Sequence, residues 1–288
     1  MSLLNSIAKL YVRLAFRDDG EFDPLATQRE LNVPGPPHKI VGRCEPLDHG
    51  GVRAFWIDKH HLENGVLVYL HGGAFYFGPV KEHWEYLARI CKQTGMAGLM
   101  VDYGIAPQHP FPVGLDEIID LTATLDMGPR WYFLGDSSGA AMALSATFEL
   151  ARLAAAFPAG LVLMSPWLDL NLDNPDIRLN ERDDPMMSVK RLSNAARCYA
   201  GVDADLSEAR LSPMFGDLSV LPPVLIQMGT ADLLLADARK FHQKCLDAGV
   251  DVVYEEFPDA FHDFMMLSIL PEAKKALRSQ KKFLIPVE

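Results

Sequence analysis

The chain has 288 residues, 49% of them hydrophobic and 23% charged, a balance typical of a globular protein with room for one large domain. Its formal net charge of −11, without a basic cluster, argues against nucleic acid or an anionic membrane surface as the main partner. The four cysteines are far apart, so we interpret them as free thiols that fit a reducing cytosol. We therefore predict a cytoplasmic protein without a metal or organic cofactor and without a membrane span.

The N-terminal segment MSLLNSIAKLYVRLAF predicts an amphipathic helix. Lys9 and Arg13 interrupt it and no small-residue cleavage site follows, so it does not fit a signal peptide. Its apolar positions fall on one stripe at helical spacing: Leu3, Leu4, Ile7, Tyr11, Leu14 and Ala15.

Residues 38–59 predict an antiparallel hairpin around His49-Gly50-Gly51, and strands then alternate with helices. The predicted strands are Val66–Leu70, Gly98–Tyr103, Trp131–Leu134, Leu161–Met164, Pro223–Met228 and Val250–Phe257. The predicted helices are His83–Gln93, Leu115–Leu125, Ser138–Ala156, Ala236–Ala248 and Pro271–Phe283. Continuous apolar strands between helices indicate an α/β fold: a mostly parallel sheet of about eight strands, flanked by helices, with the hairpin at one edge.

Two regions interrupt the alternation. Residues 1–35 precede the sheet, and residues 171–215 lie between two strands with an irregular, Asn/Asp-rich sequence followed by a helix. Insertions in parallel α/β proteins usually lie over the carboxyl ends of the strands, where ligands bind. We therefore predict a single domain, residues 1–288, in which both regions form an α-helical cap.

The sequence Gly135-Asp136-Ser137-Ser138-Gly139 matches G-x-S-x-G between a predicted strand and a predicted helix. Such a turn is sharp enough to strain its central residue, and small flanking residues relieve the clash. The pattern makes Ser137 a candidate nucleophile. By itself the pentapeptide is common, and it is more often a turn in which, here, Asp136 or Ser137 would cap the helix.

A serine nucleophile needs a base and an orienting carboxylate, which in this fold follow it along the chain on loops after strands. Asp232 follows the strand Pro223–Met228, and His262 follows the strand that ends near Phe257. The other downstream histidine, His242, falls in the middle of a predicted helix. Asp232 and His262 are therefore the candidate partners of the serine.

The segment His71-Gly72-Gly73-Ala74-Phe75 follows the strand Val66–Leu70. Paired glycines let backbone N–H groups converge on a developing oxyanion. We predict donors from Gly72, Gly73 or Ala74, together with the N–H of Ser138. His71 precedes the serine, and we interpret it as a residue that shapes the loop.

These motifs together resemble the hormone-sensitive-lipase-like branch of the α/β-hydrolase superfamily. YLHGGAFYFG is similar to its H-G-G-G segment, GDSSGA to its G-D-S-A-G-G turn, and VDYGIAPQHPFP to its D-Y-R-L-A-P-E-x-P-F-P signature. SPWLDL, GTADLLL and FPDAFHDF continue the likeness, which covers about residues 60–270. The chain departs from the pattern at Ala74, Gly104, Gln108, Ser138 and Ala140, and an ion pair that braces the loop of Gly104 and Gln108 is expected to be missing.

The resemblance implies a carboxylesterase that acts on a small-molecule ester, with Ser137, Asp232 and His262 as its catalytic triad and a two-part cap. The composition of the first helix and of Phe75, Tyr76, Phe77 and Trp167 suggests a pocket for small to medium acyl groups. Alternatives are an inert receptor for a small hydrophobic ligand, or an amidase, lactonase or deacetylase with the same triad. The oligomeric state stays open, with a homodimer among the options.

Overall fold

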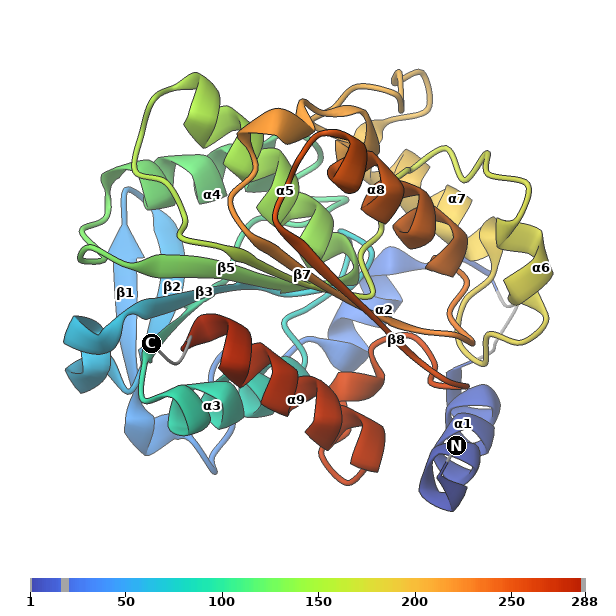
Figure 1. The fold of residues 1–288 in the computed structure, drawn as a ribbon, viewed down its shortest axis with the longest axis horizontal. Helices are drawn as coiled ribbons and strands as arrows, with labels where there is room; N and C mark the ends of the chain where they lie inside the picture. The colour runs from blue at the N-terminus through green and yellow to red at the C-terminus, as the bar shows by residue number, and fades with distance from the viewer. Residues whose placement is uncertain (1, 17–20, 286–288) are drawn as a thin grey trace.

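The computed structural model describes residues 2–16 and 21–285. At its centre lies an eight-stranded mixed sheet in the order β1-β2-β4-β3-β5-β6-β7-β8 (Figure 1). The strands are β1 (Cys44–His49), β2 (Val52–Ile57), β3 (Val66–Leu70), β4 (Ala97–Val101), β5 (Trp131–Asp136), β6 (Leu161–Met164), β7 (Val224–Gly229) and β8 (Val252–Phe257). The predicted α/β fold and its eight strands are confirmed.

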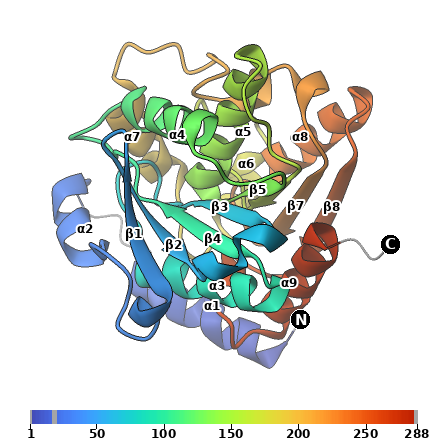
Figure 2. The same ribbon diagram turned by 90° about the vertical axis from the view of Figure 1, so that its left-hand side faces the viewer.

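Helices cover both faces of the sheet (Figures 1 and 2). One face carries α4 (Val113–Thr124), α5 (Ser137–Arg152) and α8 (Leu235–Asp247), and the other carries α3 (Lys81–Thr94) and α9 (Pro271–Leu284). Each face encloses its own apolar core. The helix predicted to reach Ala156 ends at Arg152, and Ala154 just beyond it has φ +50°.

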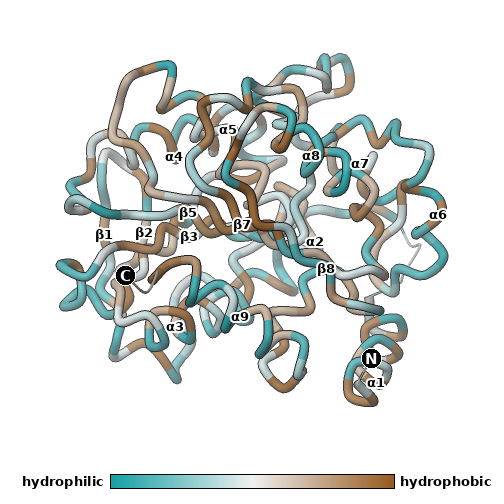
Figure 3. The backbone as a smooth tube through the Cα atoms, in the orientation of Figure 1, coloured by the Kyte–Doolittle hydropathy of each residue, from teal (hydrophilic) through white to brown (hydrophobic). Residues whose placement is uncertain are grey.

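The central strands are continuous apolar runs because both of their faces are covered. Every residue of β3, β4, β5, β6 and β7 is buried. Figure 3 shows this apolar material along the middle of the molecule. From β4 to β8 all neighbouring strands are parallel, so their carboxyl ends lie along one edge of the sheet.

The predicted hairpin forms the other margin of the sheet. β1 pairs with β2 in antiparallel register, and β2 pairs in antiparallel register with β4. The turn between the two strands holds Gly50 at φ +62° and Gly51 at φ +88°, a conformation that glycine adopts without strain. The edge position of the hairpin is confirmed.

The N-terminal helix is present as α1 (Leu3–Phe16), but the side that packs on the protein carries Asn5, Ala8 and Val12 rather than the predicted stripe. Asn5 donates a hydrogen bond to the Asp259 carbonyl at 2.8 Å, and Lys9 pairs with the Asp259 carboxylate at 2.8 Å. The apolar stripe faces solvent, with Tyr11 69% and Leu14 81% exposed. These contacts give no support to the hypothesis that this stripe lines a pocket, because the opposite side of the helix packs on the protein. The side chain of Ala15 lies outside the described residues.

The other region that interrupts the alternation, residues 171–215, contains α6 (Ile177–Glu181) and α7 (Val189–Ala200). The side chain of Ser188 caps α7 by accepting the N–H of Arg191. A further helix, α2 (Pro24–Leu31), follows α1. Within the described ranges, no helix is long and apolar enough to cross a membrane.

Candidate active site

Ser137 lies at the sharp turn between β5 and α5. It adopts φ +50°, a left-handed conformation that strains a residue with a side chain, and it is 6% exposed. A Cβ on Gly135 would lie 2.6 Å from the Gly139 carbonyl carbon, and a Cβ on Gly139 would lie 2.0 Å from the Leu70 carbonyl oxygen. Both glycines are therefore required for the chain to pass this close to itself.

We expect Gly139→Ala to destabilise the protein by about 1–3 kcal/mol through overpacking, although alanine favours a helix by about 1 kcal/mol over glycine. The added methyl would meet the carbonyl oxygens of Leu70 and His71, which are backbone atoms that move only with the strand. Urea unfolding measures the change. Gly42→Ala is the matched control, since a Cβ there meets nothing within 4 Å, and equal midpoints for both variants would contradict the expectation.

His262 and Asp232 come together from separate loops. His262 Nδ1 lies 3.0 Å from Asp232 Oδ2, and both side chains are buried. The loops follow β8 and β7, neighbouring parallel strands, so they leave the same edge of the sheet as the Ser137 turn after β5. A carboxylate on Nδ1 fixes the imidazole so that Nε2 is available for proton transfer.

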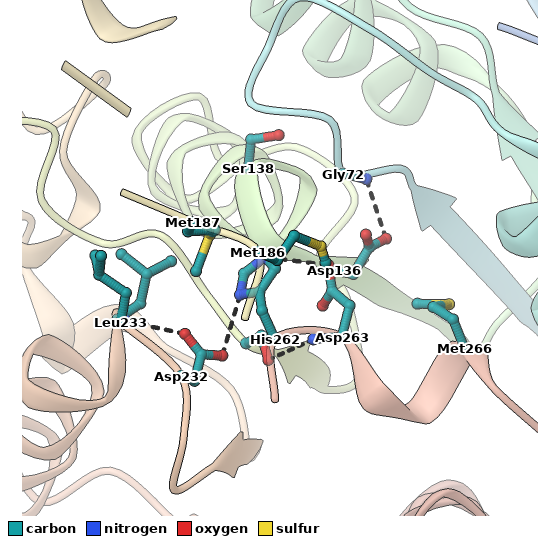
Figure 4. Close-up of polar contacts among 12 residues, drawn as sticks. Gly72, Asp136, Ser138, Met186, Met187, Asp232, Leu233, His262, Asp263 and Met266 are labelled. Carbon is teal, nitrogen blue, oxygen red and sulfur yellow. Dashed lines mark hydrogen bonds and ion pairs between the residues drawn. The ribbon is translucent and has the colours of Figure 1, made fainter. Parts of the chain in front are cut away.

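The other imidazole nitrogen has a partner that sequence reasoning missed. His262 Nε2 lies 3.2 Å from Asp263 Oδ2 (Figure 4), and within the described part of the chain the Ser137 hydroxyl forms no hydrogen bond with His262. Burial acts to lower the pKa of His262, but the Asp263 and Asp232 carboxylates outweigh it and raise the pKa well above its ordinary value. The only signal in the sequence was the adjacency of Asp263 to the histidine.

A second missed carboxylate, Asp184, connects residues 171–215 to the loop that carries Asp232. It accepts the backbone N–H groups of Met186 and Met187 at 2.7 and 2.8 Å, and that of Leu233 at 2.8 Å. Burial, and then the nearby Asp232, raise the pKa of Asp184 to about 6. In the sequence, Asp184 lies within an irregular, charged stretch, where no hydrophobic periodicity indicates that its side chain is buried.

The glycine loop after β3 has a strained backbone. Gly73, Ala74 and Phe75 have φ values of +121°, +50° and +66°. A Cβ on Gly73 would lie 1.9 Å from the Phe77 carbonyl oxygen, so the loop closes tightly on itself at this glycine. Among the described residues, the N–H groups of Gly73 and Ala74 have no hydrogen-bond partner.

The two N–H groups beside them are already engaged. The Gly72 N–H donates to Asp136 Oδ1 at 3.0 Å, as Figure 4 shows, and the Phe75 N–H donates to Ser138 Oγ at 3.2 Å. Of the four predicted oxyanion donors, Gly72 thus has its N–H occupied within the protein. Ser138 has a further role as the acceptor that ties the serine turn to the loop.

Asp136 anchors this loop from within the core. It is fully buried and also accepts the hydroxyl of Tyr69, while His83 Nε2 lies 3.3 Å from its Oδ2. Burial acts to raise the pKa of Asp136, but His83 and the hydrogen bonds from Tyr69 and Gly72 hold it below its ordinary value. The buried charge therefore stays ionised and holds the loop beside the Ser137 turn.

His71 packs beneath the same loop. Its Nδ1 lies 2.8 Å from the Gly72 carbonyl oxygen, its ring stacks on Tyr103 with centroids 4.4 Å apart, and burial lowers its pKa to about 3. A buried, neutral imidazole bonded to the loop backbone fits the interpretation of His71 as a residue that shapes the loop.

The predicted substrate contacts are buried aromatic side chains against which both interrupting regions pack. Phe75 stacks on Tyr199 of α7 with centroids 4.1 Å apart, and its centroid is 5.4 Å from that of Trp167. Tyr76 packs edge-on against Phe22, with centroids 5.1 Å apart. Residues of the N-terminal and 171–215 regions thus pack against these aromatic side chains of the core.

Gln28 of α2 braces the loops at the place where the family resemblance implies that an ion pair is missing. Its side-chain amide donates to the carbonyl oxygens of Tyr76 and Ala106, each at 2.8 Å. The Gln108 amide donates to Gln28 Oε1 at 2.8 Å, and the Gly104 N–H donates to Glu117 Oε2 at 2.6 Å. Within the described ranges, no group of three or more His, Cys, Asp or Glu residues could hold a metal ion.

A mostly parallel sheet with a serine at a strained strand-to-helix turn and a His–Asp pair on later loops is the arrangement of an α/β-hydrolase. Residues 67–266 match a family described as alpha/beta hydrolase fold. The chain is 33% identical over 252 residues to an esterase of Acinetobacter venetianus, covering 86% of this chain and 83% of the relative. It is 32% identical over 260 residues to an acetyl-hydrolase of Streptomyces hygroscopicus, covering 88% and 84%.

Solved structures agree with these sequence relatives. An esterase from the bacterial hormone-sensitive lipase family superimposes with a TM-score of 0.86 at 27% identity, covering 99% of this chain and 98% of that one. EstE5, in a crystal soaked with p-nitrophenyl butyrate, gives a TM-score of 0.89 at 25% identity over the same shares. The chain belongs to the hormone-sensitive-lipase-like esterase family of the α/β-hydrolase superfamily, and it is a carboxylesterase.

Proposed function

We propose that this esterase hydrolyses short- to medium-chain carboxylic esters through Ser137, His262 and Asp232, with a covalent acyl-enzyme. The observation that carries the proposal is the strained φ of +50° at Ser137, on the sheet edge that also carries the His262–Asp232 pair. Strain at a single buried serine is costly, and it persists where a mechanism uses the hydroxyl that the turn presents.

In this mechanism Ser137 Oγ attacks the ester carbonyl carbon while His262 Nε2 takes the hydroxyl proton. The tetrahedral intermediate then expels the alcohol, which receives that proton from His262. Water, activated by the same nitrogen, attacks the acyl-enzyme, releases the carboxylic acid and restores Ser137. Asp232 holds the imidazole throughout, and His262 Nε2 turns from Asp263 towards Ser137 to begin the cycle.

The oxyanion donors in this proposal are the N–H groups of Gly73, Ala74 and Ser138. Gly72 is left out because its N–H already donates to Asp136. Convergent backbone donors stabilise the negative charge of the tetrahedral intermediate without reorganising during the reaction. Ala74 serves as well as glycine here because the donor belongs to the backbone.

We further propose that residues 1–35 and 171–215 form one cap on a single domain. Three contacts support this: Tyr199 on Phe75, Gln28 on the Tyr76 carbonyl, and Arg13 of α1 on the Arg182 carbonyl at 3.1 Å. The last contact joins the two segments to each other. Residues 1 and 17–20 of the proposed cap lie outside the described residues.

The acyl preference follows from the aromatic wall of Phe75, Tyr76 and Trp167, whose rings are already packed against protein. We expect kcat/KM on p-nitrophenyl esters to peak between acetate and hexanoate and to fall at least about tenfold by laurate. Each methylene that is buried on binding contributes ~0.8 kcal/mol, and a long acyl chain finds no space in which to bury its methylenes. The acetyl-hydrolase relative and the butyrate ester soaked into EstE5 support short acyl groups.

A panel of these esters measures the preference. Phe75→Leu shortens one side chain of the wall and should move the peak to a longer chain. Phe157→Leu is the matched control, because Phe157 follows α5 at the opposite end of the sheet and is 38% exposed. If kcat/KM of the wild type peaks at laurate, the proposed acyl-chain preference is contradicted, but the proposed triad is not.

A further inference from the structure

His262 lies between two carboxylates. Asp232 Oδ2 is 3.0 Å from its Nδ1, and Asp263 Oδ2 is 3.2 Å from its Nε2 (Figure 4). A triad requires only the first contact. The second occupies the nitrogen that has to receive the proton of Ser137, so Asp263 competes with the serine for it.

Asp263 is held in this position by its surroundings. Its backbone has φ +54°, a left-handed conformation that Asp tolerates better than most residues, and its N–H donates to Ser165 Oγ at 3.1 Å. The side chain is only 17% exposed, and its buried Oδ1 has no hydrogen-bond partner among residues 2–16 and 21–285. A carboxylate in such a place is stabilised mainly by the imidazole that it faces.

The other charged and titratable groups around the pair come from several elements. They are Asp232 after β7, Asp184 in the 171–215 region, Asp136 at the end of β5, His83 of α3 and Tyr69 of β3. Three backbone N–H groups stabilise the negative charge of Asp184, and Tyr69, Gly72 and His83 stabilise that of Asp136. Burial, together with Asp136 and Asp232, raises the pKa of Asp263 to about 7, against the opposing effect of His262.

We propose that Asp263 is a positioning residue that keeps a proton on His262 Nε2 in the resting enzyme and so sets the pH above which the enzyme works. The proposal rests on the proposed role of His262 as the general base. While the proton is present, Nε2 points at Asp263 and cannot accept from Ser137. Once this proton is lost to solvent, the Nε2 lone pair and the Asp263 carboxylate repel each other, Nε2 turns from Asp263 towards Ser137, and the Ser137 hydroxyl can donate to it.

The direction of the effect follows from charge. A negative carboxylate beside Nε2 favours the positively charged imidazolium, so it raises the pKa of His262. A general base works only in its neutral form, so kcat/KM rises with pH through that raised pKa. Removing the Asp263 charge should therefore move the acid limb of the profile towards lower pH.

The experiment compares pH profiles of kcat/KM on p-nitrophenyl butyrate for the wild type and for Asp263→Asn, which keeps the size and the left-handed backbone. We expect the acid limb of the variant to move down by about 1–3 pH units, the range for an opposite charge at this distance. On the acid side, kcat/KM of the variant should then exceed that of the wild type about tenfold for each pH unit by which the limb has moved.

Asp263→Gly is the second variant, because glycine adopts φ +54° without strain, and it should move the acid limb in the same direction. Asp247→Asn is the matched control: it removes a carboxylate at the end of α8 that bonds Gln243 and does not face His262, so its limb should coincide with that of the wild type. An unmoved limb in both Asp263 variants, or a move to higher pH, overturns the proposal.

A measurement on the unmutated protein guards against variants that do not fold. In ¹⁵N-histidine NMR, the His262 imidazole should stay doubly protonated well above its ordinary pKa of about 6.5. If the His262 imidazole titrates at or below its ordinary pKa, the proposed role of Asp263 is contradicted. Failure of the proposed function is recognised separately. An active Ser137→Ala enzyme contradicts the mechanism. An inactive Ser137→Ala enzyme, together with an unmoved acid limb in the Asp263 variants, contradicts only the role of Asp263.

Discussion

Ser137→Ala is expected to lower kcat/KM on p-nitrophenyl butyrate by at least about 10⁴-fold, while the protein stays folded. The change removes the hydroxyl that attacks the ester, and the remaining donors and binding contacts supply only residual catalysis. The backbone stays acceptable because alanine occupies φ +50° at a cost similar to that of serine. Steady-state kinetics and circular dichroism measure the two parts of this expectation.

The neighbouring serine gives the control. Ser138→Ala retains the proposed backbone donor but loses the Oγ that accepts the Phe75 N–H at 3.2 Å. One neutral hydrogen bond contributes about 1 kcal/mol, so the loss should not exceed about tenfold. A fluorophosphonate should label wild type and Ser138→Ala but not Ser137→Ala. Equal labelling or equal activity of the wild type and Ser137→Ala would contradict the mechanism. A wild type that the fluorophosphonate does not label would favour the inert receptor.

Asp232→Asn should reduce kcat by about 10⁴-fold with little change in stability. Asn keeps the shape but presents an amide that can donate to Nδ1, so the imidazole no longer carries its proton there. Among the described residues, Asp263 is then the carboxylate that remains in contact with His262, and it contacts Nε2, the nitrogen that has to remain free. The ring is thus held in the Nε2–H tautomer, whereas catalysis requires the proton on Nδ1.

Asp237→Asn is the matched control for that variant. Asp237 is also a buried carboxylate, bonded by Asn174 at 2.8 Å, and burial raises its pKa to about 6. It lies on α8 and makes no contact with His262, so the loss of its charge should change kcat by less than about tenfold. Comparable losses in both variants would show that a buried charge in general, rather than the carboxylate on Nδ1, supports the reaction.

The alternation of strands and helices was readable from the sequence because period and apolarity are local properties. The hairpin around Gly50 and Gly51 and the buried strands appeared with boundaries close to those observed. Ser137 could be separated from Ser138 because the glycines of the turn and its place after a strand are also local signals. Asp232 and His262 were found because this fold puts such residues on loops that directly follow strands.

Contacts between distant segments could not be predicted from local patterns. α1 was predicted from its period, yet its apolar stripe faces solvent because Asn5 and Lys9 bind Asp259, which lies at the far end of the sequence. The N–H of Gly72 could not be excluded as an oxyanion donor without knowing that it donates to Asp136. Both outcomes depend on contacts between segments that are distant along the chain.

Spacing and local pattern were therefore enough to predict the α/β class, the order of elements, the esterase family and the residues of the proposed triad, because each depends on residues that are close together along the chain. The surroundings of those residues depend on the tertiary structure. It places two carboxylates on one imidazole, ties Asp184 to the loop of Asp232, and occupies some backbone donors while leaving others open. The physical reason is that hydrogen bonding and pKa depend on distances of a few ångströms between groups that only folding brings together.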